Sequence, residues 1–556
     1  MHSIQIRDLS FTYRNGESKA LDGIDFHLQE GEMVVLMGRA GAGKSTLCRC
    51  MNGIIPGFQK GEFSGDIQVF GESTKNKKIY ELARNVGLVF QDFEPQLFST
   101  SVELEVAFGP ENISLPREEI AVRIDYALRT VGLKGFEDRQ PYNLSGGEKQ
   151  RLAIASILSS KPRVLVLDEP TTDLDPQGRY DILSALKRLR DESISLLMVE
   201  QDAEDVVDAN RVVIMDAGRI VASGSAREVL GNIYRLEQHG IRPPQIARLF
   251  SRISDTLPFN AVEAYNQLDA SFDAEELRLL HWEDEHRKKD YGNIAIDVRE
   301  LKHSYPMVGN VLAGVDLQIR EGEFVAIIGQ NGSGKTTLTK HFNGLLRPSA
   351  GSVLCFGRDT SDMNVSELGK IVGYVFQNPD HQIFASSVKD EVTFGPRNYD
   401  LSEEEISTNV DEALEAVYLR GYEDNDPFSL TKGERQRVAV ASVLACKPKV
   451  LILDEPTTGL DYSQQISMME LLKSLNAAGH TIIIITHSLW VVAEYAHRAI
   501  VMHDGAVVMD GKVREVFSQQ DELESVGMKL PEIVKLGNMI GANLLSVDEY
   551  GRVMKG

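Results

Sequence analysis

Two glycine-rich segments have the residue types and the spacing of a phosphate-binding loop. Gly38–Ser45 and Gly329–Thr336 each follow the pattern Gly-x-x-x-x-Gly-Lys-Ser/Thr. Each comes directly after an apolar run of strand length, Met33–Met37 or Phe324–Ile328, which is the context that this motif requires. Glycines let successive backbone N–H groups and a helix N-terminus face an anion. The sequence therefore predicts two sites for nucleotide phosphates.

The side chains of the two loops have separate expected roles. Lys44 and Lys335 would reach the β- and γ-phosphates, and the hydroxyls of Ser45 and Thr336 would hold Mg²⁺. The nucleotide-binding residues predicted from the loops are Gly38, Gly41, Gly43, Lys44, Ser45 and Thr46 in the first and Gly329, Gly332, Gly334, Lys335, Thr336 and Thr337 in the second.

An acidic pair follows an apolar run downstream of each loop. Asp168 and Asp454 end runs of four apolar residues, so we expect them at the carboxyl edge of a buried parallel strand, where they suit Mg²⁺ coordination. The next residues, Glu169 and Glu455, can polarise an attacking water. Helix capping is the alternative role for such acids, and the upstream phosphate loops disfavour it.

The same motifs recur in the same order in each half, which indicates a duplicated pair of α/β domains. We expect the first domain over residues 1–235 and the second over 293–525. Residues 236–292 are expected to form an appendage and an acidic linker, and residues 526–556 a second appendage. The two appendages share the pattern Pro-x-Ile-x-x-Leu, at Pro244–Leu249 and Pro531–Leu536.

The composition of the 556 residues narrows the class of protein. A formal charge of -23 disfavours phosphate backbones and anionic lipid as direct partners. No apolar run is long enough to cross a membrane, and the opening residues show no signal-peptide pattern. The four cysteines form no disulfide framework, so we expect reduced thiols: Cys48, Cys50, Cys355 and Cys446.

Leu144–Arg151, reading Leu-Ser-Gly-Gly-Glu-Lys-Gln-Arg, resembles the signature of the ATP-binding-cassette superfamily, and the resemblance covers nearly the whole chain. It implies two tandem P-loop NTPase domains, each a RecA-like core with an antiparallel β subdomain and a helical subdomain. It also implies ATP hydrolysis, with the signature of one domain closing over ATP held by the other. The signature residues are Ser145, Gly146 and Gly147, with Thr431 and Gly433 in the second half.

Further positions match family motifs one by one. Gln91 and Gln377 match the family's Q-loop glutamine, and the resemblance implies that they contact Mg²⁺ and water. It also implies that Tyr13 and Tyr305 stack on adenine. A plain core role is the alternative for these tyrosines. The remaining matches are the D-loop aspartates and the switch histidine: Asp175, Asp461 and His487.

Two departures from the family pattern predict an asymmetric pair of ATP sites. Gln201 stands where the second half has His487, and a glutamine cannot carry a proton. The second signature has Thr431 and Lys432 in place of serine and glycine. With head-to-tail pairing, both departures fall in the site that holds Lys44, Glu169 and Gln201. We therefore expect that site to hydrolyse ATP slowly, and the site with Lys335, Glu455 and His487 to turn it over.

The segments after the Q-loop glutamines, Gln91–Asn112 and Gln377–Asn398, are similar to each other. The residue sequence of Phe376–Phe384 resembles that of the energy-coupling-factor (ECF) ATPases, which drive uptake of vitamins and of cobalt or nickel. The two appendages resemble the C-terminal extension of the same group. The resemblance implies a transmembrane coupling protein, a substrate-binding membrane protein and a place on the cytoplasmic face of the membrane. Glu94 and Asp380 are candidates to contact the coupling protein, with plain solvated surface as the alternative.

The competing interpretations are other tandem-cassette proteins. A factor acting on ribosomes or nucleic acid is disfavoured by the acidic linker and the net charge of -23. A DNA-repair ATPase would carry Cys-x-x-Cys zinc modules, which the sequence lacks. The tandem ATPase of sugar importers is disfavoured because its residue sequence around the Q-loop differs from the one here. The transported solute and the choice between intrachain and interchain pairing stay open.

Overall fold

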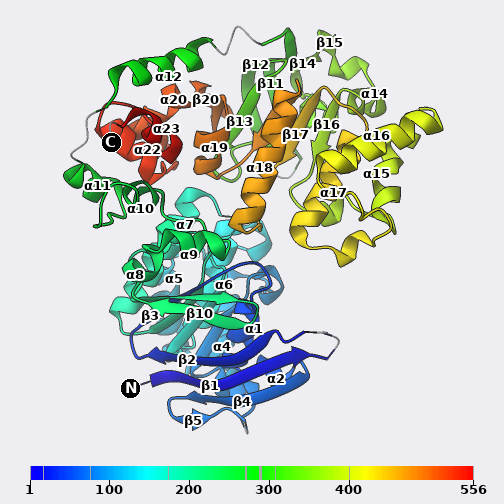
Figure 1. The fold of residues 1–556 in the computed structure, drawn as a ribbon. Helices are drawn as coiled ribbons and strands as arrows, with labels where there is room; N and C mark the ends of the chain where they lie inside the picture. Colours follow the sequence, from blue (N-terminus) through cyan, green and yellow to red (C-terminus); the bar gives the residue numbers. More distant parts are fainter. Residues whose placement is uncertain are drawn as a thin grey trace. The chain divides into compact units, whose positions relative to one another are not determined.

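The computed structural model describes residues 2–14, 16, 18–75, 77–172, 174–268, 272–286, 291–306, 309–399 and 401–554. The chain divides into two compact units, Met1–Phe259 and Asn260–Gly556 (Figure 1). The expected linker lies partly at 269–271 and 287–290, which are outside the described residues. Among the described residues, none of the helices combines the length and the apolar character needed to cross a membrane.

The first unit contains a six-stranded sheet in the order β10-β9-β3-β8-β7-β6. Its strands are parallel except for the β9–β10 pair, and β3, β7 and β8 are buried along their whole length because both faces of the sheet are covered. A second, antiparallel sheet has the order β2-β1-β4-β5. The strands are β1 (His2–Tyr13), β2 (Leu21–Gln29), β3 (Met33–Met37), β4 (Gly61–Val69), β5 (Glu72–Ser73), β6 (Val86–Val89), β7 (Val164–Asp168), β8 (Ser195–Val199), β9 (Arg211–Asp216) and β10 (Arg219–Gly224).

The second unit repeats this topology, with sheets in the orders β16-β17-β18-β13-β19-β20 and β12-β11-β14-β15. The predicted fold class, two α/β domains each with an additional antiparallel sheet, is therefore confirmed. The strands are β11 (Ile294–Tyr305), β12 (Gly309–Arg320), β13 (Phe324–Gly329), β14 (Ala350–Cys355), β15 (Arg358–Asp359), β16 (Val372–Val375), β17 (Val450–Asp454), β18 (Thr481–Ile485), β19 (Arg498–His503) and β20 (Ala506–Lys512).

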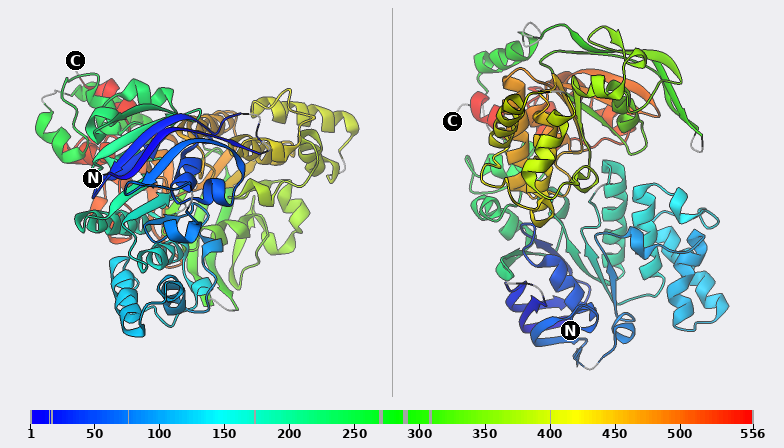
Figure 2. Two further views of the ribbon diagram at one scale, coloured as in Figure 1. Left: turned by 90° about the horizontal axis from the view of Figure 1, so that it is seen from below. Right: turned by 90° about the vertical axis from the view of Figure 1, so that its right-hand side faces the viewer.

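Each unit has a group of three helices beside the edge of its large sheet. In the first unit α6 packs on α4, α5 and β6, and in the second α17 packs on α15, α16 and β16. The second group is the yellow and yellow-green cluster in Figures 1 and 2. These helices are α4 (Val102–Asn112), α5 (Arg117–Thr130), α6 (Gly146–Leu158), α15 (Val388–Arg397), α16 (Glu403–Ala416) and α17 (Lys432–Leu444).

The other helices of the first unit are α1 (Lys44–Met51), α2 (Ile54–Gly57), α3 (Ile79–Leu82), α7 (Pro176–Asp191), α8 (Ala226–Leu230), α9 (Ile233–Gln238) and α10 (Gln245–Phe250). Those of the second are α11 (Ala261–Gln267), α12 (Ala274–His286), α13 (Lys335–Phe342), α14 (Val365–Gly369), α18 (Tyr462–Ala477), α19 (Leu489–Tyr495), α20 (Val513–Phe517), α21 (Gln520–Ser525), α22 (Glu532–Met539) and α23 (Val547–Val553).

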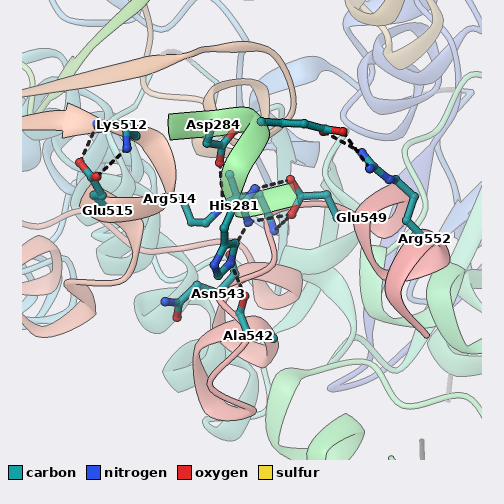
Figure 3. Close-up of polar contacts among 11 residues, drawn as sticks. His281, Asp284, Lys512, Arg514, Glu515, Ala542, Asn543, Glu549 and Arg552 are labelled. Carbon is teal, nitrogen blue, oxygen red and sulfur yellow. Dashed lines mark hydrogen bonds and ion pairs between the residues drawn. The ribbon is translucent and has the colours of Figure 1, made fainter. Parts of the chain in front are cut away.

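Helix α12, from the expected linker, is bound to the C-terminal helices of the second unit (Figure 3). The guanidinium of Arg514, at the start of α20, donates to Asp284 of α12 at 2.8 Å and to Glu549 of α23 at 2.7 Å and 3.0 Å. It also donates to the backbone carbonyl of Asn543 at 2.6 Å. Residues 274–286 therefore belong with the C-terminal appendage of the second unit.

We expect Arg514→Ala to lower the free energy of unfolding of the second unit by about 3 kcal/mol, because it leaves two largely buried carboxylates without their cation. Arg552→Ala is the matched control. Its side chain is 43% exposed, against 9% for Arg514, and it pairs with Glu283, which lies next to Asp284 on α12. Loss of this exposed ion pair should lower the free energy of unfolding by less than about 1 kcal/mol. Urea unfolding of the full chain measures both variants, and equal losses would contradict the assigned role of Arg514.

Candidate nucleotide sites and switch loops

Each predicted phosphate loop joins a buried strand to a helix, β3 to α1 and β13 to α13. The first glycine of each loop packs against a neighbouring strand. A Cβ at Gly38 would lie 2.0 Å from the carbonyl oxygen of Met215, and one at Gly329 would lie 2.2 Å from that of Met502. No other residue type fits at these two positions, so the sheet itself sets the path of the loop.

The loop lysines lie inside the curve of their own loops. Lys44 Nζ donates to the carbonyls of Gly38 and Arg39, both at 2.7 Å. Lys335 Nζ donates to the carbonyls of Gly329 and Gln330 at 2.8 Å and 2.9 Å. Both lysines are largely buried. An ammonium held within a ring of backbone groups at a helix N-terminus is suited to bind phosphate.

A hydroxyl and a carboxylate converge beside each lysine. Ser45 Oγ donates to Asp168 Oδ1 at 3.1 Å, and Thr336 Oγ1 donates to Asp454 Oδ2 at 2.9 Å. Burial raises the pKa of Asp168 to about 6 and also raises the pKa of Asp454. Buried oxygen ligands that are short of positive charge fit Mg²⁺. These four residues would therefore hold the cation, which would neutralise phosphate charge.

The predicted water-polarising acids contact the switch positions in both units. His487 Nδ1 lies 2.9 Å from Glu455 Oε1, and Gln201 Nε2 donates to Glu169 Oε1 at 2.9 Å. Gln91 Nε2 donates to the other oxygen of Glu169, also at 2.9 Å. An imidazole can hold and transfer a proton and a primary amide cannot, so the two units differ chemically at this contact.

A group of charged residues surrounds Gln201, in the loop that follows β8. Arg179 Nη1 of α7 lies 3.3 Å from Asp202 Oδ2 and 3.2 Å from Asp205 Oδ2. Glu200 is buried, burial raises its pKa to about 7, and it accepts the backbone N–H of Gln201 at 2.9 Å. The corresponding sequence positions of the second unit hold uncharged residues: Gln465, Thr486, Ser488 and Val491. The sequence motifs did not predict this cluster, although the charged residues at these four positions of the first half, against uncharged ones in the second, could have indicated it.

The predicted signature and D-loop residues stand at helix N-termini. Ser145 caps α6 and Thr431 caps α17, and each accepts the N–H of a glutamate three residues on at 3.3 Å. The threonine therefore keeps the capping role of the serine. Asp175 and Asp461 cap α7 and α18 in the same way. The signature glycines lie in the first turns of these helices: Gly146 and Gly147 in α6 and Gly433 in α17.

The predicted adenine-stacking tyrosines end the first strand of each antiparallel sheet. The Tyr13 hydroxyl lies 3.0 Å from Thr46 Oγ1, and the Tyr305 hydroxyl lies 3.4 Å from Thr337 Oγ1. Both threonines stand in the helix that follows the phosphate loop. Each tyrosine is therefore next to its own predicted phosphate site.

The two acids predicted to meet a partner are engaged within the chain. Glu94 pairs with Lys149 of α6, and Asp380 pairs with Arg435 of α17, both at 2.6 Å. Gln377 follows β16 in the same segment as Asp380. The structure thus connects each Q-loop segment to the helix that begins at the signature, a link that sequence spacing alone did not indicate.

Comparison with known proteins supports the family resemblance. The family model described as ABC transporter matches residues 21–172 and 312–458. A protein from Caldanaerobacter subterraneus is 49% identical and covers 98% of both chains, and one from Methanosarcina acetivorans is 41% identical over 99% of this chain and 94% of its own. Both are provisionally named ABC transporter ATP-binding proteins.

Among solved structures, cbiO1 of Clostridium perfringens is described as part of the ABC transporter complex cbiONQ. It is 38% identical, covers 45% of this chain and 99% of its own, and has a TM-score of 0.40. The family match and the two long relatives carry the assignment. The chain belongs to the ABC transporter family as an ATP-binding protein, and its two ATP-binding domains make it an ATPase.

Proposed function

We propose that this chain is the energy-coupling subunit of an ECF-type importer for a vitamin or a transition metal. It would work at the cytoplasmic face of the membrane through a transmembrane coupling protein and a substrate-binding membrane protein. The residue sequences of the Q-loop segments and of the two appendages support this branch of the family. The observation that carries the proposal is a matching pair of exposed phenylalanines beside each Q-loop.

The two aromatic pairs have the same geometry. Phe98 and Phe108 are 61% and 46% exposed, and their rings meet edge to face at 4.7 Å. Phe384 and Phe394 are 61% and 51% exposed and meet edge to face at 4.8 Å. Clustered exposed aromatic rings are typical of protein interfaces. Two equal patches in one chain fit a partner that contacts both cassettes.

A buried carboxylate holds each patch in place. Glu105 Oε2 accepts the backbone N–H groups of Phe98 and Ser99 at 3.0 Å and 2.8 Å. Glu391 does the same in the second unit for Phe384 and its neighbour, at the same distances. Both glutamates are buried although they stand next to an exposed surface. The rings are thus preorganised for binding, which reduces the entropy lost on association.

The ion pairs of the Q-loop segments would connect a membrane partner to the nucleotide sites. Glu94 and Asp380 lie in the Q-loop segments, and their partners Lys149 and Arg435 lie on the signature helices. We infer that these acids transmit force within the chain, in addition to any contact with a partner. Movement of a signature helix on ATP binding would then displace the patch and rock the coupling protein.

Within this function we propose an asymmetric pair of ATP sites. The site of Lys335, Glu455 and His487 would hydrolyse ATP, because its acid contacts an imidazole. The site of Glu169 and Gln201 would bind ATP and hydrolyse it slowly, because an amide occupies that place. The assignment of signatures to sites rests on the head-to-tail pairing of the family. It places Thr431 opposite the slow site.

Purification of tagged Glu455→Gln protein with ATP, from gently solubilised native membranes, tests the proposed function. The slow variant should stay bound to its partners, and small integral membrane proteins should copurify. Recovery of ribosomal proteins instead would support the soluble tandem-cassette alternative and overturn the importer. The net charge of -23 favours the first outcome.

A further inference from the structure

The aromatic ring that supports each adenine-site tyrosine differs between the two units. Phe11 meets Tyr13 edge to face, with ring centroids 4.9 Å apart and an angle of 78°. His303 meets Tyr305 in the same way, at 4.7 Å and 75°. The supporting residue precedes its tyrosine by two positions on the same strand in both units. The support is therefore an inert ring in the first unit and an ionisable one in the second.

A second histidine lies behind the first. His341 stands on α13, the helix of the second phosphate loop, and is fully buried. Its Nε2 lies 3.2 Å from His303 Nδ1, and the two rings meet at 75° with centroids 4.8 Å apart. A chain of contacts thus runs from the phosphate-loop helix through two imidazoles to Tyr305.

The hydrogen-bond partners determine which ring nitrogens carry protons. His341 Nδ1 lies 2.7 Å from the carbonyl of Thr337, which can only accept, so this nitrogen carries the proton and Nε2 is an acceptor. His303 Nδ1 lies 3.2 Å from the carbonyl of Arg347, so it also carries a proton and donates toward His341. A proton added to His341 Nε2 would face the N–H of His303. Neutral His341 therefore accepts this hydrogen bond from His303, and protonated His341 cannot accept it.

The surroundings of His341 offer no compensating anion among the described residues. From β11 it faces His303, and from its own helix the Thr337 carbonyl. The turn after α13 presents the Arg347 carbonyl, while the Arg347 guanidinium is directed to the carbonyls of Thr360 and Met363. Burial lowers the pKa of His341, the carbonyls of Thr337 and Arg347 oppose this shift, and the neighbouring His303 adds to it; the net shift of the pKa is downward.

At the two equivalent positions, the first unit has no group that titrates in this pH range. Cys50 follows Lys44 by six positions, as His341 follows Lys335, and it is buried. Burial raises the pKa of the Cys50 thiol, so it stays neutral in acid. Phe11 and Cys50 thus fill the places of His303 and His341 without an ionisable pair.

We propose that His303 and His341 are positioning residues for ATP in the second cassette, and that they weaken nucleotide binding there, but not in the first cassette, as the pH falls. The proposal rests on the proposed role of Tyr305 as the adenine-stacking residue. Protonation of His341 would place two N–H groups opposite each other and weaken the hold on the His303 ring that packs on Tyr305, while the contact of the Tyr305 hydroxyl with Thr337 stays. Because the folded-state pKa is lowered, the support is complete above about pH 6.5 and is lost as the pH falls through that lowered pKa.

The test compares the full chain with a variant that carries the residues of its own first cassette, His303→Phe with His341→Cys. Both are made in a Lys44→Ala background, so that a fluorescent ATP analogue reports the second site. As the pH falls from 7.5 to 5.0, the protein with both histidines should lose affinity by a larger factor than the variant, because only the former gains a proton at His341. The protonation of the analogue itself affects both proteins equally. Equal pH profiles would overturn the proposal.

Two further variants keep the test decisive. His341→Cys alone removes the buried acceptor and leaves His303 with the Arg347 carbonyl. Like the double variant, it should make the affinity depend less on pH than in the protein with both histidines. Tyr305→Ala tests the role on which the proposal rests. If it leaves affinity at pH 7.5 unchanged, the assignment of Tyr305 fails. If it weakens binding while the histidine variants keep the full pH dependence, only the inference about the histidines fails.

Discussion

Replacement of Glu455 by glutamine is expected to reduce the steady-state ATPase rate of the full chain by about 100-fold or more, because it removes the general base of the hydrolytic site. In the structure Glu455 Oε1 lies 2.9 Å from His487 Nδ1, so the acid and the proton-carrying group are already in contact. Glu169→Gln should leave most of the activity, because Gln201 has replaced the histidine beside that acid.

The two variants are matched controls, since each removes one carboxylate oxygen at the equivalent position of a duplicated site. Phosphate release from purified protein at saturating Mg²⁺-ATP gives the rates, and equilibrium binding of an ATP analogue shows that both variants still hold nucleotide. Loss of activity in Glu169→Gln with full activity in Glu455→Gln would reverse the proposed asymmetry. Equal losses would show that the two sites work in alternation.

The double variant Phe384→Ala/Phe394→Ala is expected to lose association with its membrane partner by at least about 30-fold, since exposed aromatic anchors each contribute about 2 kcal/mol or more. The two rings form one exposed patch on a loop held by the buried Glu391. Because both rings are exposed and pack on each other, their removal leaves the buried nucleotide-site residues in place, and the basal ATPase rate of the purified chain should stay within about twofold.

Copurification from membranes and uptake by cells measure the effect, and Val508→Ala is the control. Val508 is 46% exposed on β20, at the edge of the large sheet opposite β16 and the helical group. Substitution there should leave both readouts unchanged. Full association of the double phenylalanine variant would rule out the patch as the contact surface. A collapse of basal ATPase would instead indicate a structural role for the rings.

Much of the fold and of the two nucleotide sites could be predicted from the sequence, because short motifs determine them locally. An apolar strand followed by a glycine loop requires a tight turn, and the structure pairs Ser45 with Asp168 and Thr336 with Asp454. The separation of these pairs along the chain did not matter, because each aspartate ends one parallel strand of the sheet and each hydroxyl lies in the helix that follows another strand of the same sheet. The predicted roles of these side chains in catalysis stay predictions.

Contacts between distant side chains without a motif could not be predicted. Arg514 and Asp284 are far apart in the sequence and belong to no shared motif. The sequence therefore did not indicate that α12, which lies within the expected linker, packs with the C-terminal helices. The sequence predicted Glu94 and Asp380 as contacts of a coupling protein, with solvated surface as the alternative, but it gave no sign of their ion pairs with Lys149 and Arg435 on the signature helices. His303 and His341 are unremarkable in the sequence until β11 and α13 bring them together.

The most direct test of the importer is a photo-crosslinking amino acid at position 384 in living cells, with position 508 as the control site. Residue 384 is expected to capture an identified multispanning membrane protein, and this capture should change when Glu455→Gln traps the ATP-bound state. Residue 508 should capture no such protein. Capture of ribosomal or other non-membrane proteins at residue 384, or equal capture at both sites, would contradict it.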